Sequence, residues 1–159
     1  MKLYIKQKIF SIGDKYTVKD EFDQIYYYVE GQIFSIGAKL RIYDQNRTEK
    51  IFIKRKVFTF MPEYEFYRGE ELIAIIQKKF KMFKNEFTVE SKYGNYVLDG
   101  NFLGMDLSIT KDGKEVAIVM KKWFTWGDSY EIDILDDSDI DFLTALVIVI
   151  DNCLHNENQ

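Results

Sequence analysis

A motif that recurs along the chain is the feature that most limits its possible folds. Residues 9–13, with the sequence IFSIG, recur identically as residues 33–37, 24 positions later. Looser copies follow at residues 57–59, 87–89 and 123–127. A recurring unit of this length is typical of one supersecondary element used several times. The sequence therefore predicts a fold assembled from similar successive units.

Each unit has the pattern of a β-hairpin. Apolar and polar side chains alternate in residues 16–18, 40–42, 64–66, 87–89 and 130–134. Such alternation places one face of a strand on a core and the other in water. Turn signals at Gly69, Gly94 and Gly113 precede or border the return strands, which we expect at residues 25–29, 50–53, 72–76, 96–98 and 116–120. Counting both arms gives about ten to twelve strands, a number that favours closure into a barrel or sandwich.

The C-terminal segment has a different pattern, because apolar residues cover every side of a helix from Ile140 onward. Its central residues are Phe142, Leu143, Leu146, Val147, Val149 and Ile150. A helix that is apolar all round is buried. We expect a helix over residues 138–154 inside the barrel, with Ser138 as its N-cap and Asp139 and Asp141 in its first turn. A strand over residues 146–150 is the alternative, since β-branched side chains lower helix propensity.

Composition indicates one domain over residues 1–159 and excludes several classes of protein. Apolar residues make up 47% of the chain, so it is not disordered, and the net charge of −4 argues against nucleic-acid binding. The apolar run 142–150 is much shorter than the roughly 20 residues that cross a bilayer. The single cysteine, Cys153, excludes an intrachain disulfide and a cysteine-based zinc site. With no signal-peptide pattern at residues 1–8, we expect a cytoplasmic protein.

Several segments together resemble a known family. They are residues 5–15, 29–31, 100–104 and 121–130, followed by the apolar helix with Ile150 and Asp151. On these residues the chain resembles bacterial members of the LURP-one-related (LOR) family, in the tubby C-terminal-like superfamily to which phospholipid scramblases are similar. The resemblance implies a mainly β fold, a closed antiparallel barrel of about twelve strands around a central hydrophobic helix. Tubby domains bind phosphoinositide headgroups and scramblases act on membranes, but no binding residue of theirs can be matched to a position here.

Basic residues recur just before the aromatic start of the units, except in the second unit, where Gln32 occupies the position, and we expect them near one rim of the barrel. They are Lys8, Lys54, Arg55, Lys56, Lys78, Lys79, Lys121 and Lys122. Such a basic collar would attract anionic lipid headgroups or an acidic partner. The alternative is that these are ordinary solvated strand ends. Trp123, Phe124 and Trp126 beside the last pair are typical either of a membrane interface or of core packing.

Evidence for catalysis or a metal is weak. Asp137, Asp139 and Asp141 have the spacing that starts a calcium loop, but Phe142 and Ile148 occupy the positions of its glycine and glutamate. Helix capping explains the same acids without a metal. Cys153 and the single histidine, His155, are two residues apart and would point to different sides of a helix.

No Gly-rich phosphate loop or G-x-S-x-G elbow is present in the sequence, so we assign no catalytic residue and expect no cofactor. We interpret the sequence as a non-enzymatic tubby-like barrel whose physiological role the sequence does not identify, with peripheral binding of anionic phospholipid headgroups, or of a protein at the membrane, as the hypothesis. One alternative is a protein-interaction or structural module without lipid contact, and a second is a small-molecule carrier or an enzyme. A helix that fills the barrel would disfavour a carrier, because no space for a ligand would remain in the middle.

Overall fold

Twelve strands and one helix make up the described part of the chain. The computed structural model describes residues 1–6, 15–32, 37–59, 63–81, 84–124, 127–136 and 139–156. The first six strands are β1 (Lys2–Lys6), β2 (Lys15–Asp20), β3 (Ile25–Gln32), β4 (Lys39–Tyr43), β5 (Glu49–Arg55) and β6 (Glu63–Arg68). The others are β7 (Glu71–Lys81), β8 (Lys84–Ser91), β9 (Gly94–Asn101), β10 (Asp106–Lys111), β11 (Lys114–Phe124) and β12 (Gly127–Ile134), followed by helix α1 (Ile140–Asn156).

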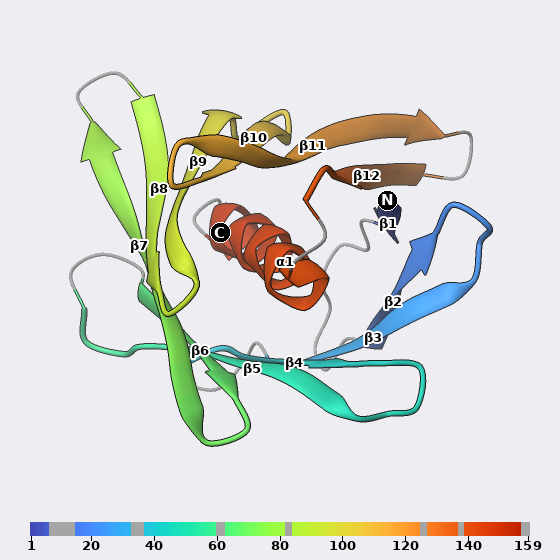
Figure 1. Ribbon diagram of the computed structural model, residues 1–159, viewed down its shortest axis with the longest axis horizontal. Coiled ribbons are helices and arrows are strands. Elements are labelled where there is room, and N and C mark those ends of the chain that lie inside the picture. The colour runs from blue at the N-terminus through green and yellow to red at the C-terminus, as the bar shows by residue number, and fades with distance from the viewer. Residues whose placement is uncertain are drawn as a thin grey trace.

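The strands form a closed antiparallel barrel. Each strand pairs with its neighbours in sequence, and β1 pairs with β12, for example Leu3 opposite Ile132. Closure leaves no free edge on the sheet, which is how a long series of hairpins avoids edge-to-edge aggregation. Figure 1 shows the helix in the centre of the ring of strands. The predicted fold class is confirmed, and all ten strands predicted by residue range fall within observed strands; β1 and β10 were not among them.

The inward faces of the strands pack on the helix. Alternate residues such as Leu40 and Ile42 are buried, while Arg41 between them is on the outside. The helix side chains predicted to fill the centre are all 0–2% exposed: Phe142, Leu143, Leu146, Val147, Val149 and Ile150. Burial of each contributes roughly 1.5–3 kcal/mol. The barrel and the helix therefore stabilise each other, because each buries the apolar surface of the other.

The helix begins later than predicted. It starts at Ile140, and the carboxylate of Asp139 accepts the backbone N–H of Phe142 at 3.1 Å. Asp139 therefore caps the described helix, while Ser138, the predicted N-cap, lies outside the described residues. Asp139 also pairs with Arg68 of β6, so an ionic contact with the barrel fixes the capping carboxylate. The strand alternative for residues 146–150 was wrong, because burial on all sides outweighs the lower helix propensity of β-branched residues.

Two other predictions meet the limits of the described residues. Most of the two IFSIG copies lies in residues 7–14 and 33–36, outside the described part, so the internal repeat stays a prediction. Among the described residues, no helix has the length and apolarity that crossing a bilayer would require.

Candidate functional site

The barrel has two chemically different ends. Because all neighbouring strands are antiparallel, the odd-numbered strands all finish at one end, here called the collar end. They start at the opposite end, where Asp139 caps the helix, here called the cap end. The helix runs about 25 Å from the cap end toward the collar end, at 1.5 Å per residue over its 17 residues.

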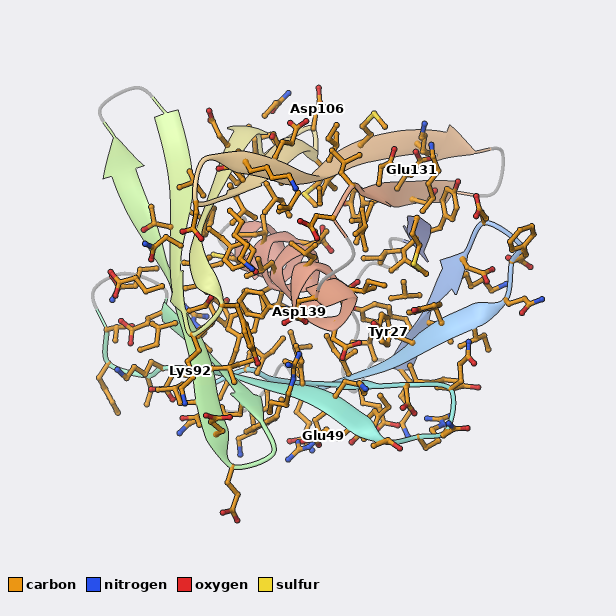
Figure 2. All side chains as sticks on the ribbon, in the orientation of Figure 1. Tyr27, Glu49, Lys92, Asp106, Glu131 and Asp139 are labelled. Atoms are coloured by element: carbon orange, nitrogen blue, oxygen red, sulfur yellow. The ribbon has the colours of Figure 1, made fainter. Side chains whose placement is uncertain are left out.

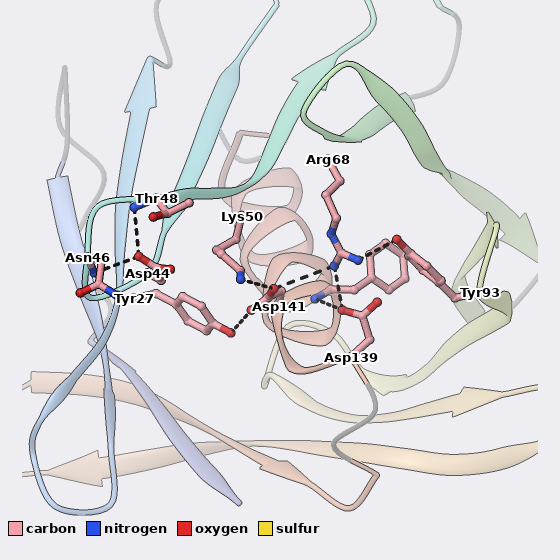
Figure 3. Close-up of polar contacts among 10 residues, drawn as sticks. Tyr27, Asp44, Asn46, Thr48, Lys50, Arg68, Tyr93, Asp139 and Asp141 are labelled. Atoms are coloured by element: carbon pink, nitrogen blue, oxygen red, sulfur yellow. Dashed lines mark hydrogen bonds and ion pairs between the residues drawn. The ribbon is translucent and has the colours of Figure 1, made fainter.

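The cap end holds a group of paired charges, the cap cluster, formed by Tyr27, Lys50, Arg68, Asp139 and Asp141 (Figure 3). A guanidinium nitrogen of Arg68 lies 3.0 Å from Asp139 and 3.9 Å from Asp141. The ammonium of Lys50 lies 3.6 Å from Asp141, to which the phenol of Tyr27 donates a hydrogen bond. These contacts join the first turn of the helix to strands β3, β5 and β6.

The ionisation states in the cap cluster fit this anchoring role. Burial raises the pKa of the Tyr27 phenol, and the neighbouring carboxylate of Asp141 raises it further, so Tyr27 stays a protonated donor. Burial alone would lower the pKa of Arg68, but the carboxylate of Asp139 outweighs it and the pKa is raised. Figure 2 shows Tyr27 and Asp139 close to the start of the helix.

The suggested calcium site meets this cluster. Asp137 lies outside the described residues, while Asp139 and Asp141 are already paired with Arg68, Lys50 and Tyr27. Within the described ranges, no group of three His, Cys, Asp or Glu side chains is arranged to hold a metal ion. The geometry that is visible therefore uses these two acids for helix capping and ion pairing.

The predicted collar residues lie toward one end of the barrel but differ in their surroundings. Lys56 pairs with Glu63 at 2.7 Å and with Glu65 at 3.6 Å. Lys122 lies 3.4 Å from Glu131, whose side chain is only 4% exposed. Lys121 is half-buried in the same strand, β11. Much of the positive charge at these positions is thus engaged with the barrel itself.

Two of the predicted residues, Lys54 and Arg55, have no carboxylate partner among the described residues. Lys54 is exposed at the end of β5, and directly opposite it on β4 lies Lys39, which is also exposed and has no such partner. Like charges in directly opposed positions destabilise a sheet. On its other side Lys54 lies opposite Glu65 of β6, which is 3.6 Å from Lys56. Lys39, Lys54 and Arg55, here called the cationic tip, are therefore three neighbouring cations that form no ion pair within the described residues.

An exposed aromatic residue follows the cationic tip. Phe58, between β5 and β6, is 98% exposed and has a backbone φ of +63°. A positive φ is a genuine outlier for a bulky side chain. Gly37 packs closely against the segment that precedes Phe58, because a Cβ at Gly37 would lie 3.2 Å from the carbonyl oxygen of Arg55 and 3.3 Å from a methyl group of Val57. The cationic tip, which forms no ion pair within the described part of the chain, thus lies next to an apolar side chain that does not pack on the described protein.

Sequence reasoning missed Lys39 of the cationic tip and the exposure of Phe58. In the second unit the position of the recurring basic residue is occupied by Gln32, so the pattern did not include Lys39. Only the strand register brings Lys39 opposite Lys54. Phe58 was counted among the strand aromatics of the repeat, and nothing local in the sequence indicates that it faces water. An alignment of each predicted strand with the next one in antiparallel register could have placed Lys39 opposite Lys54.

Several other predicted site residues lie outside the described part. Lys8 and Trp126 are not described, and neither are the side chains of Lys78, Lys79, Trp123, Phe124 and His155. Cys153 is buried at 2% exposure in helix α1.

Family membership follows from sequence comparison. A closed twelve-stranded barrel around a C-terminal helix is the architecture expected from the resemblance, and the family model described as LURP-one-related matches residues 1–151. The chain therefore belongs to the LURP-one-related family. It is similar to the uncharacterized protein YxjI of Bacillus subtilis (strain 168), with 33% identity over 160 residues that cover 100% of this chain and 97% of that protein. No solved structure matches the chain.

Proposed function

We propose that this protein binds the surface of anionic phospholipid membranes through the cationic tip and Phe58, without a chemical step. The observation that carries the proposal is that two features occur together at the end of β5: three cations without an ion pair in the described structure, and a phenylalanine three residues after Arg55 that is 98% exposed. Cations attract the negative surface of a bilayer, and an aromatic ring inserts at its interface.

The expected affinity is modest. Each Lys or Arg near an anionic surface contributes about 1 kcal/mol, and burial of a phenylalanine adds roughly 1.5–3 kcal/mol. The cationic tip and Phe58 together therefore supply about 5 kcal/mol, which is in the range of a single myristoyl chain. That value predicts reversible, salt-sensitive binding.

The central helix supports this proposal over a carrier function. The apolar side chains of α1 from Phe142 to Ile150 pack against the inward faces of the strands, in the place where a carrier barrel holds its ligand. The outer surface is then the part of the molecule on which a partner can bind.

Vesicle co-sedimentation tests the proposal. The parent protein should bind vesicles containing phosphatidylserine, and binding should fall on pure phosphatidylcholine or in high salt. Replacement of all three residues of the cationic tip by Gln (Lys39→Gln, Lys54→Gln, Arg55→Gln) should weaken binding about 100-fold, at about 1 kcal/mol per charge.

The matched control removes the same charge from the other end of the barrel. Lys92, Lys111 and Lys114 lie at the cap end, in or next to the turns before β9 and β11. Their triple Gln variant should bind like the parent. If the parent ignores anionic lipid, or if the two triple variants bind equally, the lipid proposal fails. The protein-interaction alternative would then remain.

A further inference from the structure

We infer that the barrel docks end-on, with the collar end toward the bilayer and two separate apolar side chains, Phe58 and Leu103, inserted. This inference rests on the proposed function and adds its geometry, that is, which surface of the protein meets the lipid. The helix start and the cap cluster would then face away from the membrane.

Leu103 is a second apolar side chain directed into solvent at the collar end. It lies between β9 and β10 and is 83% exposed. Strand β9 runs in the same direction as β5, so the connections that follow them lie at the same end. From β5 to β9 there are four strand spacings of about 4.8 Å, which places the two sites about 19 Å apart along the barrel wall. Two insertion points at that separation restrict how the barrel can tilt.

The turn around Leu103 is firmly held. Its neighbours Phe102 and Met105 are buried, and the ring of Phe102 lies 5.1 Å from that of Phe87. The backbone N–H of Gly104 donates to the side chain of Asn101 at 3.0 Å. The fold thus fixes the turn from both sides and presents Leu103 outward. A preorganised apolar tip loses little conformational entropy on insertion.

Charge distinguishes the exposed apolar residues of the two ends. At the cap end, Phe22 is 75% exposed, but it lies in a run of acidic neighbours, Asp20, Glu21 and Asp23. Leu72 and Leu135 at the same end also adjoin acids, Glu70 and Glu71 in one case and Asp136 in the other. Phe58 instead follows three consecutive basic residues, 54–56. Ion pairs partly neutralise these acids: Asp23 pairs with Lys19, Glu71 with Lys92 and Asp136 with Lys114. An anionic surface therefore attracts Phe58 more strongly than the apolar residues of the cap end.

A carboxylate close to Leu103 opposes docking, whereas Glu63 and Glu65 at the same end pair with Lys56. Asp106 is exposed three residues after Leu103 and lies on the outside of the barrel (Figure 2). Leu103 therefore contributes through its apolar side chain, and Asp106→Asn should strengthen binding to anionic vesicles several-fold. The same change at Asp23, beside Phe22, should have little effect, because the cap end is away from the lipid.

Tryptophan substitution with brominated lipid tests the orientation. Phe58→Trp, Leu103→Trp and Phe22→Trp each place a reporter at an exposed position, and the signal of the parent protein, which contains Trp123 and Trp126, is subtracted. On vesicles of phosphatidylserine and brominated phosphatidylcholine, the first two reporters should be quenched and the third should not. Circular dichroism checks that each variant is folded.

The possible outcomes separate the two proposals. Quenching in both the Phe58→Trp and the Leu103→Trp variants, with none in Phe22→Trp, supports end-on docking. Quenching in Phe58→Trp alone, or in Phe22→Trp, overturns the orientation and leaves membrane binding standing. If the parent protein does not sediment with the anionic vesicles at all, the proposed function itself is overturned.

Discussion

The backbone at Phe58 makes it possible to separate binding from stability with one substitution, Phe58→Asn. Phe58 is 98% exposed, so its removal loses almost no packing. Its φ of +63° lies in the left-handed region, which costs an ordinary residue roughly 1–2 kcal/mol. Asn tolerates that region, so the variant should be as stable as the parent or more stable by about 1 kcal/mol. For a chain of this length, that difference corresponds to a rise in Tm of about 2–4 °C.

The same substitution should weaken membrane binding. Loss of an inserted ring removes roughly 1.5–3 kcal/mol, which is about a 10- to 100-fold weaker partition onto anionic vesicles. Thermal unfolding and vesicle co-sedimentation measure the two effects, and Phe22→Asn at the cap end is the control that should leave binding unchanged. A fall in stability of more than about 1 kcal/mol would show that Phe58 packs on the protein. Unchanged binding would remove Phe58 as an anchor.

Three further predictions concern the fold. Burial alone would raise the pKa of Glu131, but hydrogen bonds from Lys2, at 2.6 Å, and from Lys122 hold it below its usual value. The stabilisation by ionised Glu131 is therefore present above the pKa of an unfolded glutamate and lost as pH falls through the lower folded pKa. The free energy of urea unfolding of Glu131→Gln should therefore depend less on pH, below about pH 5, than that of the parent. An equal pH dependence of the two proteins would contradict this. Asp139→Ala removes the helix cap and should cost about 1–3 kcal/mol in urea unfolding, more than Asp139→Asn, which keeps a capping acceptor; the reverse order would refute the capping role. Phe142→Ala should lower the free energy of urea unfolding by about 3–5 kcal/mol, and Phe142→Leu should lower it clearly less. Equal losses would argue against tight packing around the Phe142 ring.

The fold was predictable because the sequence contains two clear hydrophobic patterns. Period two in segments such as residues 40–42 follows from one buried strand face, and the all-round apolar pattern from Phe142 to Ile150 follows from burial on every side. Both patterns come from the same interface between barrel and helix. The contact of the capping residue Asp139 with Arg68 was not predictable in the same way, because it joins residues 71 positions apart in the sequence.

The candidate site was only partly predictable. Composition and spacing identified Lys54 and Arg55, but they equally identified Lys56 and Lys122, which are paired with carboxylates. Whether a lysine is paired depends on residues distant in sequence: Lys122 meets Glu131 across β11 and β12. Sequence spacing locates a charge on a strand, whereas pairing is a property of the assembled sheet.

The two ends of the barrel divide stability and proposed binding between them. At the cap end, opposite charges lie within 4 Å of one another and join the helix start to three strands, so a change there should act first on unfolding. At the collar end, Lys39 and Lys54 face each other as like charges, and Phe58 is both strained and unpacked. Each of these features opposes folding, and each would favour contact with an anionic, partly apolar surface. Relief of the like charges by Lys39→Gln alone should therefore leave stability equal or higher while it weakens vesicle binding, a pair of changes in opposite directions that ordinary solvated strand ends would not produce.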